Sequence, residues 1–334
     1  MRGKYDIVVG NTKIQYEFTL KRKYTFIDGA TGTGKSHIVS LIIESYNRDS
    51  FAYMKSGGLR FDYAYDLGAL RQFCSSSFTD VVIVDDESWV ASKEFKEITE
   101  KASQYFLING REFTAEFSFS MYEIYELRKY GTTKKKVLCK AERIFKDDNK
   151  LDFKPKLIIT EDEQSGFTMF KRAYEDTATT LSKWFFDEDC KIVSAKGAFN
   201  ILKVFMRYVN DYDKIFICLD SAAFGAYAED LYQIYHKWKD YGKRICVFTP
   251  ESFEYLVLLS DIMKPFDIQY ILKEPYNYID TEKHLSWESY FEWLLCDLTR
   301  NKNSSYGLHQ YSKNVPESYL KQANKVIDVI RRMN

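Results

Sequence analysis

The chain has 334 residues, which is enough for two domains that each bury a core of their own. An apolar content of 45% excludes a disordered chain, and a formal net charge of zero excludes a uniformly basic nucleic-acid-binding surface, although not a local basic groove. Six cysteines without a C-x-x-C pair predict free thiols in a reducing cytoplasm rather than a disulfide framework or a zinc site. We find no signal peptide and no apolar run near the ~18 residues of a membrane span, so we expect a cytoplasmic protein.

The first predicted elements are a β-hairpin and a glycine-rich loop. The alternation over residues 6–20 predicts a hairpin that turns at Gly10 and Asn11. A strand-like run at 24–27 is followed by Gly29-Ala-Thr-Gly-Thr-Gly34-Lys35-Ser36, and a helical run follows at 37–43. The loop matches the pattern G-x-x-x-x-G-K-[ST] at every fixed position, and it lies between a strand and a helix as that pattern requires.

This loop supplies the groups that hold a nucleoside triphosphate. Its glycines let backbone N–H groups turn inward around the β-phosphate, Lys35 places a charge near the β and γ oxygens, and the Ser36 hydroxyl joins the Mg²⁺ shell. The sequence therefore predicts ATP binding. The expected ligands are Gly29, Thr31, Gly32, Thr33, Gly34, Lys35 and Ser36.

A second apolar run, at 81–84, ends in Asp85-Asp86-Glu87. A buried parallel strand that delivers a carboxylate at its carboxyl end is how P-loop proteins hold Mg²⁺ opposite the phosphates. We assign Asp85 to the metal and Asp86 or Glu87 to polarising the attacking water, which predicts an ATPase. The assignment among these three acids is open by one residue.

A third run, at 105–108, ends in Asn109-Gly-Arg111. A polar residue on the strand beside the loop strand contacts the γ-phosphate in ATPases of the AAA type, which this feature resembles. Asn109 is therefore a candidate sensor and Arg111 a candidate charge stabiliser, while an ordinary Asn-Gly turn explains the same residues. Helical periodicity predicts helices at 93–101 and 121–129. The charged stretch 134–156 predicts a solvated strand end and a linker, with a domain boundary at residue 152.

The second half restarts an alternation of strands and helices, which predicts a parallel, doubly wound sheet. The tail from Ser286 onward predicts helices at 287–298 and 317–332. The expected strands are 157–160, 191–194, 214–219 and 244–249, with helices at 167–178, 198–209 and 224–241 between them.

Acidic residues follow three of these four strands. Glu161 follows the first, Asp220 the third, and Glu251 and Glu254 the fourth. Ligands of an open parallel sheet collect at the carboxyl ends of its strands, and carboxylates that converge there repel one another unless a divalent cation is bound. A Mg²⁺ or Mn²⁺ site suits phosphodiester chemistry. Solvated turn residues or helix N-caps explain the same acids equally well.

A glutamate after the first strand and an aspartate after the third, in this strand–helix order, resemble the TOPRIM domain of topoisomerases, primases and OLD-family nucleases. A P-loop ATPase joined to such a domain resembles OLD-family and Gabija-type defence nucleases and the ATPase–TOPRIM pairing of PARIS systems. The resemblance implies an α/β chain: a P-loop NTPase domain with a leading β-hairpin at 1–152, and a TOPRIM-like Rossmannoid domain with a helical tail at 153–334. It makes Glu161 the first acid, Asp220 the leader of the second motif, and Glu251 or Glu254 an additional acid.

Two positions differ from that family's pattern. Glu161 is followed by Asp162 instead of glycine, and the usual Asp-x-Asp is Asp220-Ser221-Ala222. Two functions therefore stay open. The first is an ATP-gated, metal-dependent nuclease that acts on DNA or RNA in defence against phage or mobile DNA. The second is an ATP-dependent switch whose second domain binds nucleic acid or a partner without cutting.

Under the nuclease hypothesis, the catalytic residues are Asp86, Glu87, Glu161 and Asp220. The metal ligands are Ser36, Asp85, Glu161, Asp220 and Glu251, with Mg²⁺ or Mn²⁺ at the second site. We also expect a homo-oligomer or a partner protein. A third hypothesis, a motor of the AAA type, requires an arginine finger, for which Arg111 is the candidate.

Overall fold

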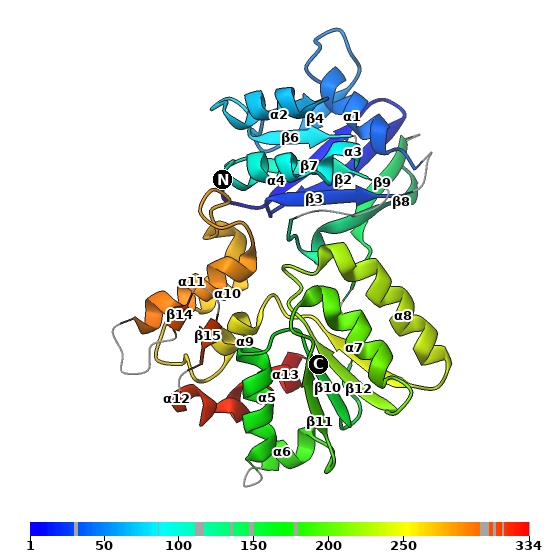
Figure 1. Cartoon of the computed structure of the whole chain (residues 1–334). Coiled ribbons are helices and arrows are strands. Elements are labelled where there is room, and N and C mark those ends of the chain that lie inside the picture. The colour runs from blue at the N-terminus through cyan, green and yellow to red at the C-terminus, as the bar shows by residue number, and fades with distance from the viewer. Residues whose placement is uncertain are drawn as a thin grey trace. The chain divides into compact units, whose positions relative to one another are not determined.

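The structure is a computed structural model that describes residues 1–29, 33–85, 87–110, 117–133, 136–146, 150–176, 180–300, 307–309, 312–315 and 317–333. The chain divides into two compact units (Figure 1). The first unit comprises Met1–Lys146 and Glu274–Ser286, and the second comprises Asp147–Lys273 and Trp287–Asn334. Each unit contains a β-sheet with helices, so the predicted α/β class is confirmed.

In the described part of the first unit, nine strands form one curled sheet in the order β4-β1-β2-β9-β8-β3-β7-β6-β5. The predicted hairpin is present, since β1 and β2 pair antiparallel with Gly10 opposite Gln15. The strands are β1 (Tyr5–Gly10), β2 (Ile14–Leu20), β3 (Tyr24–Asp28), β4 (Tyr53–Lys55), β5 (Phe61–Ala64), β6 (Val81–Val84), β7 (Tyr105–Asn109), β8 (Ile124–Thr133) and β9 (Lys136–Arg143).

The strands β8, β3, β7, β6 and β5 run parallel to one another in this sheet. All residues of β6 and β7 are buried, as expected for parallel strands that are covered on both faces. The register places Ile27 opposite Asn109, and Val84 opposite Ile108. The residues that follow β3 and β6 therefore reach the same edge of the sheet as the end of β7.

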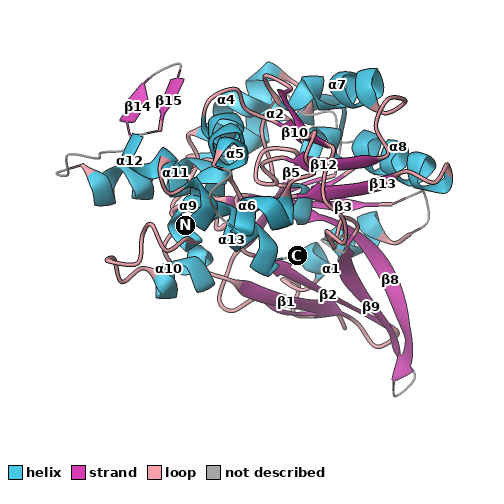
Figure 2. Ribbon diagram, turned by 90° about the horizontal axis from the view of Figure 1, so that it is seen from below, coloured by secondary structure: helices cyan, strands magenta, loops and turns pink. Residues whose placement is uncertain are grey.

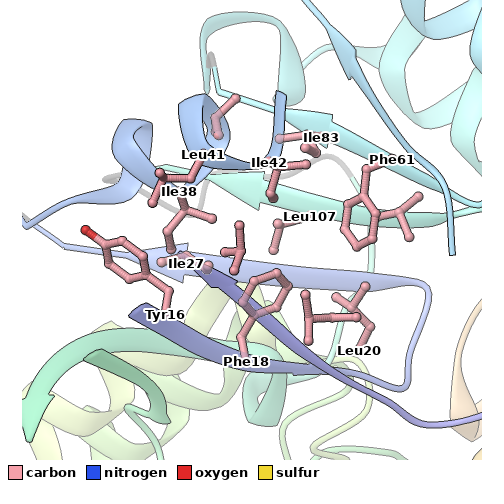
Figure 3. Packing of buried hydrophobic residues seen from close by; sticks show 14 of the residues in the cluster. Tyr16, Phe18, Leu20, Ile27, Ile38, Leu41, Ile42, Phe61, Ile83 and Leu107 are labelled. Atoms are coloured by element: carbon pink, nitrogen blue, oxygen red, sulfur yellow. The ribbon is translucent and has the colours of Figure 1, made fainter. Parts of the chain in front are cut away.

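The helices of the first unit are α1 (Lys35–Glu44), α2 (Leu67–Cys74), α3 (Glu87–Val90) and α4 (Lys93–Glu100), with a short 3₁₀ turn η1 (Met121–Glu123). Helix α1 buries Ile38, Leu41 and Ile42 in the core formed by the sheet (Figure 3). Full burial of each such side chain contributes about 1.5–3 kcal/mol. This packing fixes the start of α1 relative to the end of β3.

The predicted helix at 121–129 is wrong, and so is the linker assignment for the part of the stretch 134–156 that forms β9. Residues 124–133 form β8, which pairs antiparallel with β9, and β9 lies between β8 and β2 inside the sheet. The alternation of Leu127 with charged neighbours has the period of a strand, and Arg128 pairs across the ladder with Glu142 at 3.5 Å. The charges that indicated solvation are cross-strand partners.

The second unit contains the predicted parallel sheet. Its four strands, counted over the described residues, are β10 (Leu157–Thr160), β11 (Lys191–Ser194), β12 (Lys214–Cys218) and β13 (Arg244–Phe248), in the order β11-β10-β12-β13. A short two-stranded ribbon, β14 (Gly307–His309) and β15 (Ser312–Asn314), lies outside this sheet.

Helices flank this parallel sheet (Figure 2). Helix α7 packs against β10 and α8 against β13, whereas α13 contacts α5, α6 and α9. The strand order β11-β10-β12-β13 accounts for this separation, because the chain changes direction across the sheet after β11 and crossovers of one hand then place helices on opposite faces. The helices are α5 (Ser165–Glu175), α6 (Thr180–Phe185), α7 (Ile201–Tyr208), α8 (Ala228–Asp240), α9 (Phe253–Leu259), α10 (Gln269–Lys273), α11 (Trp287–Thr299), α12 (Glu317–Leu320) and α13 (Ala323–Met333), with 3₁₀ turns η2 (Ala198–Asn200), η3 (Gly225–Tyr227) and η4 (Pro275–Asn277).

The compact units do not divide at residue 152. They divide after Lys146, and the segment Glu274–Ser286 belongs to the first unit although it follows most of the second in the sequence. Hydrogen bonds hold this segment: the N–H of Gly3 donates to the carbonyl of Tyr276 at 2.8 Å, and Lys23 Nζ donates to the carbonyl of Thr281 at 3.1 Å. Contacts between residues so distant in sequence leave no local composition signal.

Two findings bear on the expectations from composition. All six cysteines are free thiols, as predicted, and burial raises the pKa of Cys74 and of Cys190 to about 12. Within the described ranges, no helix is both long and apolar enough to cross a membrane.

Lys23 gives the first unit a predicted pH dependence. Its side chain is 3% exposed, and burial lowers its pKa from 10.5 to about 8. Between these values the unfolded chain binds the proton that the folded chain has released, so the free energy of unfolding rises with pH there. The slope from this one group is at most about 1.4 kcal/mol per pH unit. Denaturation of wild type and Lys23→Met across this range is expected to give a difference in unfolding free energy, wild type minus variant, that rises with pH by up to this slope. The buried thiols of Cys74 and Cys190, whose raised pKa values act in the opposite direction, are present in both proteins and cancel in the difference.

The matched control for this experiment is Lys101→Met, because Lys101 is exposed at the end of α4 in the same unit. It is expected to keep the wild-type slope. Parallel stability curves for wild type and Lys23→Met would contradict the assignment of a perturbed, buried ammonium.

Candidate functional site

The first candidate site lies at the carboxyl edge of β3, β6 and β7. The structure describes Gly29, Thr33, Gly34, Lys35 and Ser36 of the glycine-rich loop. Of the other residues predicted for this site, Thr31, Gly32, Asp86 and Arg111 lie outside the described residues, as does the side chain of Glu87.

Gly34 marks the junction between the loop and α1. Its φ of 101° is in the left-handed region, and a Cβ placed there would lie 2.5 Å from the hydroxyl of Tyr16 on β2. The glycine is therefore required both by backbone conformation and by the close approach of Tyr16. The Tyr16 hydroxyl also lies 3.3 Å from Nδ1 of His37. Burial raises the pKa of Tyr16 to about 12.

The N-terminus of α1 is arranged to attract an anion. No side chain caps the helix, and its first turn contains no acidic residue. Backbone N–H groups and the positive end of the helix dipole at such a terminus favour phosphate. The Lys35 ammonium donates a hydrogen bond to the carbonyl of Gly29, so that its charge lies beside the first residue of the loop.

Asn109 connects the loop to the acidic strand end. Its side chain is 3% exposed, and its Nδ2 donates to Asp85 Oδ1 at 3.0 Å and to the Lys35 carbonyl at 3.3 Å. The buried Asn109 Oδ1 has no hydrogen-bond partner among the residues that the structure describes. The side-chain amide of Asn109 therefore connects Lys35 with Asp85, although the sequence predicted these three residues from separate segments.

The second candidate site lies at the carboxyl edge of the parallel sheet. Glu161 follows β10 and Asp220 comes two residues after β12, and these strands are neighbours at the point where the strand order reverses. Such a switch point is where open α/β sheets bind ligands. The two residues are in contact, because the backbone N–H of Asp220 donates to Glu161 Oε2 at 2.9 Å.

A fully buried cysteine lies beneath these acids. Burial raises the pKa of the Cys218 thiol well above its usual value, and the nearby charges of Asp220, Asp162 and Glu161 raise it further. Cys218 ends β12, which the sequence pattern identified only as a buried strand. The edge of the sheet is thus a place of negative potential, which a divalent cation would reduce.

The remaining acids have other local roles. Asp162 accepts hydrogen bonds from the N–H groups of Gly166 and Phe167 at 2.8 and 3.2 Å, as an N-terminal cap of α5 does. Glu163 pairs with Lys196 at 2.7 Å. The solvated-turn and cap interpretation therefore holds for this part of the acidic run.

Glu251 and Glu254 belong to the loop and first turn that begin α9. Glu251 is partly buried, and its carbonyl accepts a hydrogen bond from Ala222 N at 3.2 Å. Glu254 is fully buried in a turn that Ser252 caps through the N–H of Tyr255. Over the described ranges, no three His, Cys, Asp or Glu side chains lie together so as to hold a metal ion. The structure thus brings Glu161 and Asp220 together without making Glu251 or Glu254 part of such a group.

Sequence reasoning missed Tyr16, and it predicted Cys218 as a buried thiol in a strand without placing it near the acids. The position of Tyr16 depends on how the hairpin packs on the sheet, and that of Cys218 on which strands are neighbours, so only a three-dimensional arrangement identifies them. Comparison with known proteins does not assign a function to either site: no protein-family model matches the chain, and no curated protein matches its sequence.

Proposed function

We propose that the first unit binds ATP together with Mg²⁺ and hydrolyses it. The observation that carries this proposal is the amide of Asn109, which joins the backbone of Lys35 to the carboxylate of Asp85. A loop with the G-x-x-x-x-G-K-[ST] pattern, an uncapped helix N-terminus and a carboxylate at the end of the β6 strand support it further.

Each residue has a role in this proposal. The N–H groups of the loop and the Lys35 ammonium bind the phosphates. When ATP binds, the Lys35 ammonium exchanges its hydrogen bond to the neutral carbonyl of Gly29 for a stronger one to a charged phosphate oxygen. Ser36 and Asp85 would hold the Mg²⁺, which neutralises charge on the phosphates. Asp86 or Glu87 polarises the attacking water.

The residues present fit a hydrated cation. A buried amide oxygen without a partner costs about 1–3 kcal/mol, and the Oδ1 of Asn109 is such an atom among the described residues. Mg²⁺ usually keeps several of its waters, which can donate hydrogen bonds to neighbouring oxygens, and takes one or two carboxylates. Asp85 and the Asn109 oxygen supply these two kinds of partner.

The direct test of hydrolysis is phosphate release from Mg²⁺-ATP by wild type and by Lys35→Ala. Loss of a charge that stabilises the transferring phosphoryl group is expected to lower the rate by about 10²–10³-fold. Lys93→Ala is the control, because Lys93 is exposed on α4 and pairs with the exposed Glu97 in the next turn of its helix. Equal rates for wild type and Lys35→Ala would exclude this loop as the site of hydrolysis.

For the second unit we propose metal-dependent cleavage of nucleic acid, gated by the nucleotide state of the first unit. Glu161 and Asp220 would hold Mg²⁺ or Mn²⁺, since one or two carboxylates suffice when the substrate phosphate completes the shell. The bound metal would supply an activated water and stabilise the leaving oxygen. The contact between Asp220 N–H and Glu161 at the switch point of the sheet supports this assignment. The proposed setting is defence against phage or mobile DNA, as a homo-oligomer or with a partner protein.

A second candidate function is binding without cleavage, so that the protein is an ATP-dependent switch. The observation that favours it is Ala222, which is 1% exposed and occupies the position of the second acid in the Asp-x-Asp pattern. A buried methyl group cannot bind a metal. In either case ATP shifts the equilibrium between the open and closed states of the protein only by the difference in the binding free energy of ATP to these two states.

Glu161→Gln distinguishes the two functions. The substituted amide keeps an oxygen that accepts the hydrogen bond of Asp220, but it removes the charge that a metal requires. Incubation of plasmid DNA, RNA and tRNA with Mg²⁺ or Mn²⁺ is expected to show cleavage by wild type and none by the variant. If both proteins are equally inactive on every substrate, the nuclease proposal is wrong, and calorimetric titration with Mn²⁺ then shows whether the second unit binds a metal at all.

A further inference from the structure

An exposed apolar and basic strip lies along η2 and α7 in the second unit. The side chain of Phe199 is 67% exposed and that of Met206 is 46% exposed. Lys203 and Arg207 are exposed as well. Residues three or four positions apart share one face of a helix, so Lys203 and Arg207 follow one another along α7, and Phe199 precedes them by four residues in η2. The opposite face buries Ile201 and Phe205 toward the sheet.

The strip has one sign of charge. Residues 195–210 contain Lys196, Lys203 and Arg207 but no aspartate or glutamate, in a chain whose formal net charge is zero. Lys196 pairs with the exposed Glu163. Neither Lys203 nor Arg207 forms an ion pair with another residue of the described ranges. By contrast, the neighbouring α8 has Glu229, Asp230 and Asp240 among its lysines.

The strip begins at the acidic edge of the sheet. The N–H of Gly197 donates to the carbonyl of Glu161 at 2.8 Å. Lys196, the residue before it, has a φ of 60° and is the one non-glycine residue with positive φ in the described part of the chain. A left-handed conformation costs a residue with a Cβ about 1–2 kcal/mol, and it persists only where the surroundings impose it. The turn therefore holds the first lysine of the strip beside Glu161.

We propose that Lys196, Phe199, Lys203 and Arg207 bind single-stranded nucleic acid, with phosphates on the three cations and a base stacked on Phe199. This inference rests on the proposed function of the second unit and names its substrate. Cationic side chains about 6 Å apart along a helix can follow a phosphate backbone. An exposed aromatic ring between them is the usual platform for an unpaired base, whose stacking contributes about 1–3 kcal/mol. A protein partner fits less well, because lysine is depleted in protein–protein interfaces.

The experiment measures binding of a fluorescent oligothymidylate of about 20 nucleotides to the full chain by anisotropy, in EDTA so that no metal-dependent cleavage occurs. The charge-reversed variant K203E/R207E is expected to bind at least about tenfold more weakly. The slope of log K against log salt is expected to fall by about 1.4, since each lost phosphate contact on a single strand removes about 0.7. Phe199→Ala is expected to bind about 5–150-fold more weakly.

The matched control is K237E/K239E, which reverses two exposed charges on α8 and is expected to bind within about twofold of wild type. Circular dichroism verifies that each variant is folded. Three results overturn the inference: no binding by wild type, equal binding by the strip and control variants, or tighter binding of the same sequence as a duplex. Binding through the strip without cleavage in Mg²⁺ or Mn²⁺ supports the inference while it rejects the nuclease. Cleavage in Mg²⁺ or Mn²⁺ that is as fast in the strip variants as in wild type supports the nuclease and rejects the inference that the strip binds its substrate.

Discussion

Replacing Asp85 with alanine is expected to lower the Mg²⁺-dependent turnover of ATP by about 10²–10³-fold. The same substitution should make the effect of Asn109→Ala much smaller than it is in wild type. The physical reason is the 3.0 Å hydrogen bond from Asn109 Nδ2 to Asp85 Oδ1, which orients the carboxylate. Without Asp85, the amide has nothing to orient at that position.

The measurement is kcat/KM for wild type, both single variants and the double variant. Residues in direct contact show coupling energies of about 0.5–3 kcal/mol, and we expect this pair to lie at the upper end. Asn47→Ala is the control, because Asn47 is exposed after α1 and should contribute independently of Asp85. Strictly additive effects of Asp85→Ala and Asn109→Ala would contradict the assignment of Asn109 as a residue that positions Asp85.

The largest expected loss of stability comes from Glu123→Ala, at about 3–5 kcal/mol. The Glu123 side chain is fully buried, with Arg22 Nε at 3.1 Å, Lys21 Nζ at 3.5 Å and Arg143 Nη2 at 3.7 Å from its Oε1. The Tyr125 hydroxyl donates to its Oε2 at 3.2 Å. Removing the carboxylate leaves the guanidinium of Arg22, which is 6% exposed, as a buried charge without its counter-ion.

Chemical denaturation of the two variants Glu123→Ala and Glu126→Ala checks this prediction. Glu126 lies on β8, which begins directly after Glu123, and pairs with Arg128, but that pair is exposed to solvent, and its loss should cost less than about 1 kcal/mol. Glu123→Gln retains an acceptor for the surrounding donors and should fall between these values. A loss below about 1 kcal/mol for Glu123→Ala would show that the cluster contributes little to folding.

The strands that build both sites could be predicted from sequence because they are buried on both faces. Val81–Val84 and Leu157–Thr160 are short apolar runs without polar interruption, and the structure places both at the predicted residues. Acidic residues follow the carboxyl ends of these strands, so the acids of both candidate sites could be predicted once the strands were located. The glycine-rich loop was equally visible, since its pattern depends on local backbone geometry.

The pairing of the segments could not be predicted in the same way. Residues 124–143 contain charged side chains that pair with side chains of neighbouring strands, as Arg128 does with Glu142 and Lys140 with Glu17, and a single sequence does not reveal those partners. The segment Glu274–Ser286 joins the first unit through contacts with residues near the start of the chain. The link between Asn109 and Asp85 likewise depends on β7 lying between β3 and β6, which is a property of strand order.

The most direct test of the central claim is calorimetric titration of the full chain with ATP in the presence of Mg²⁺, with wild type and Lys35→Ala measured side by side. We predict saturable binding of one ATP per chain in wild type and an affinity about 10²-fold lower or more in the variant, because the Lys35 ammonium, beside Gly29, makes charge-assisted bonds to the phosphates. Absence of binding by wild type, or equal affinity of the two proteins, would contradict the account.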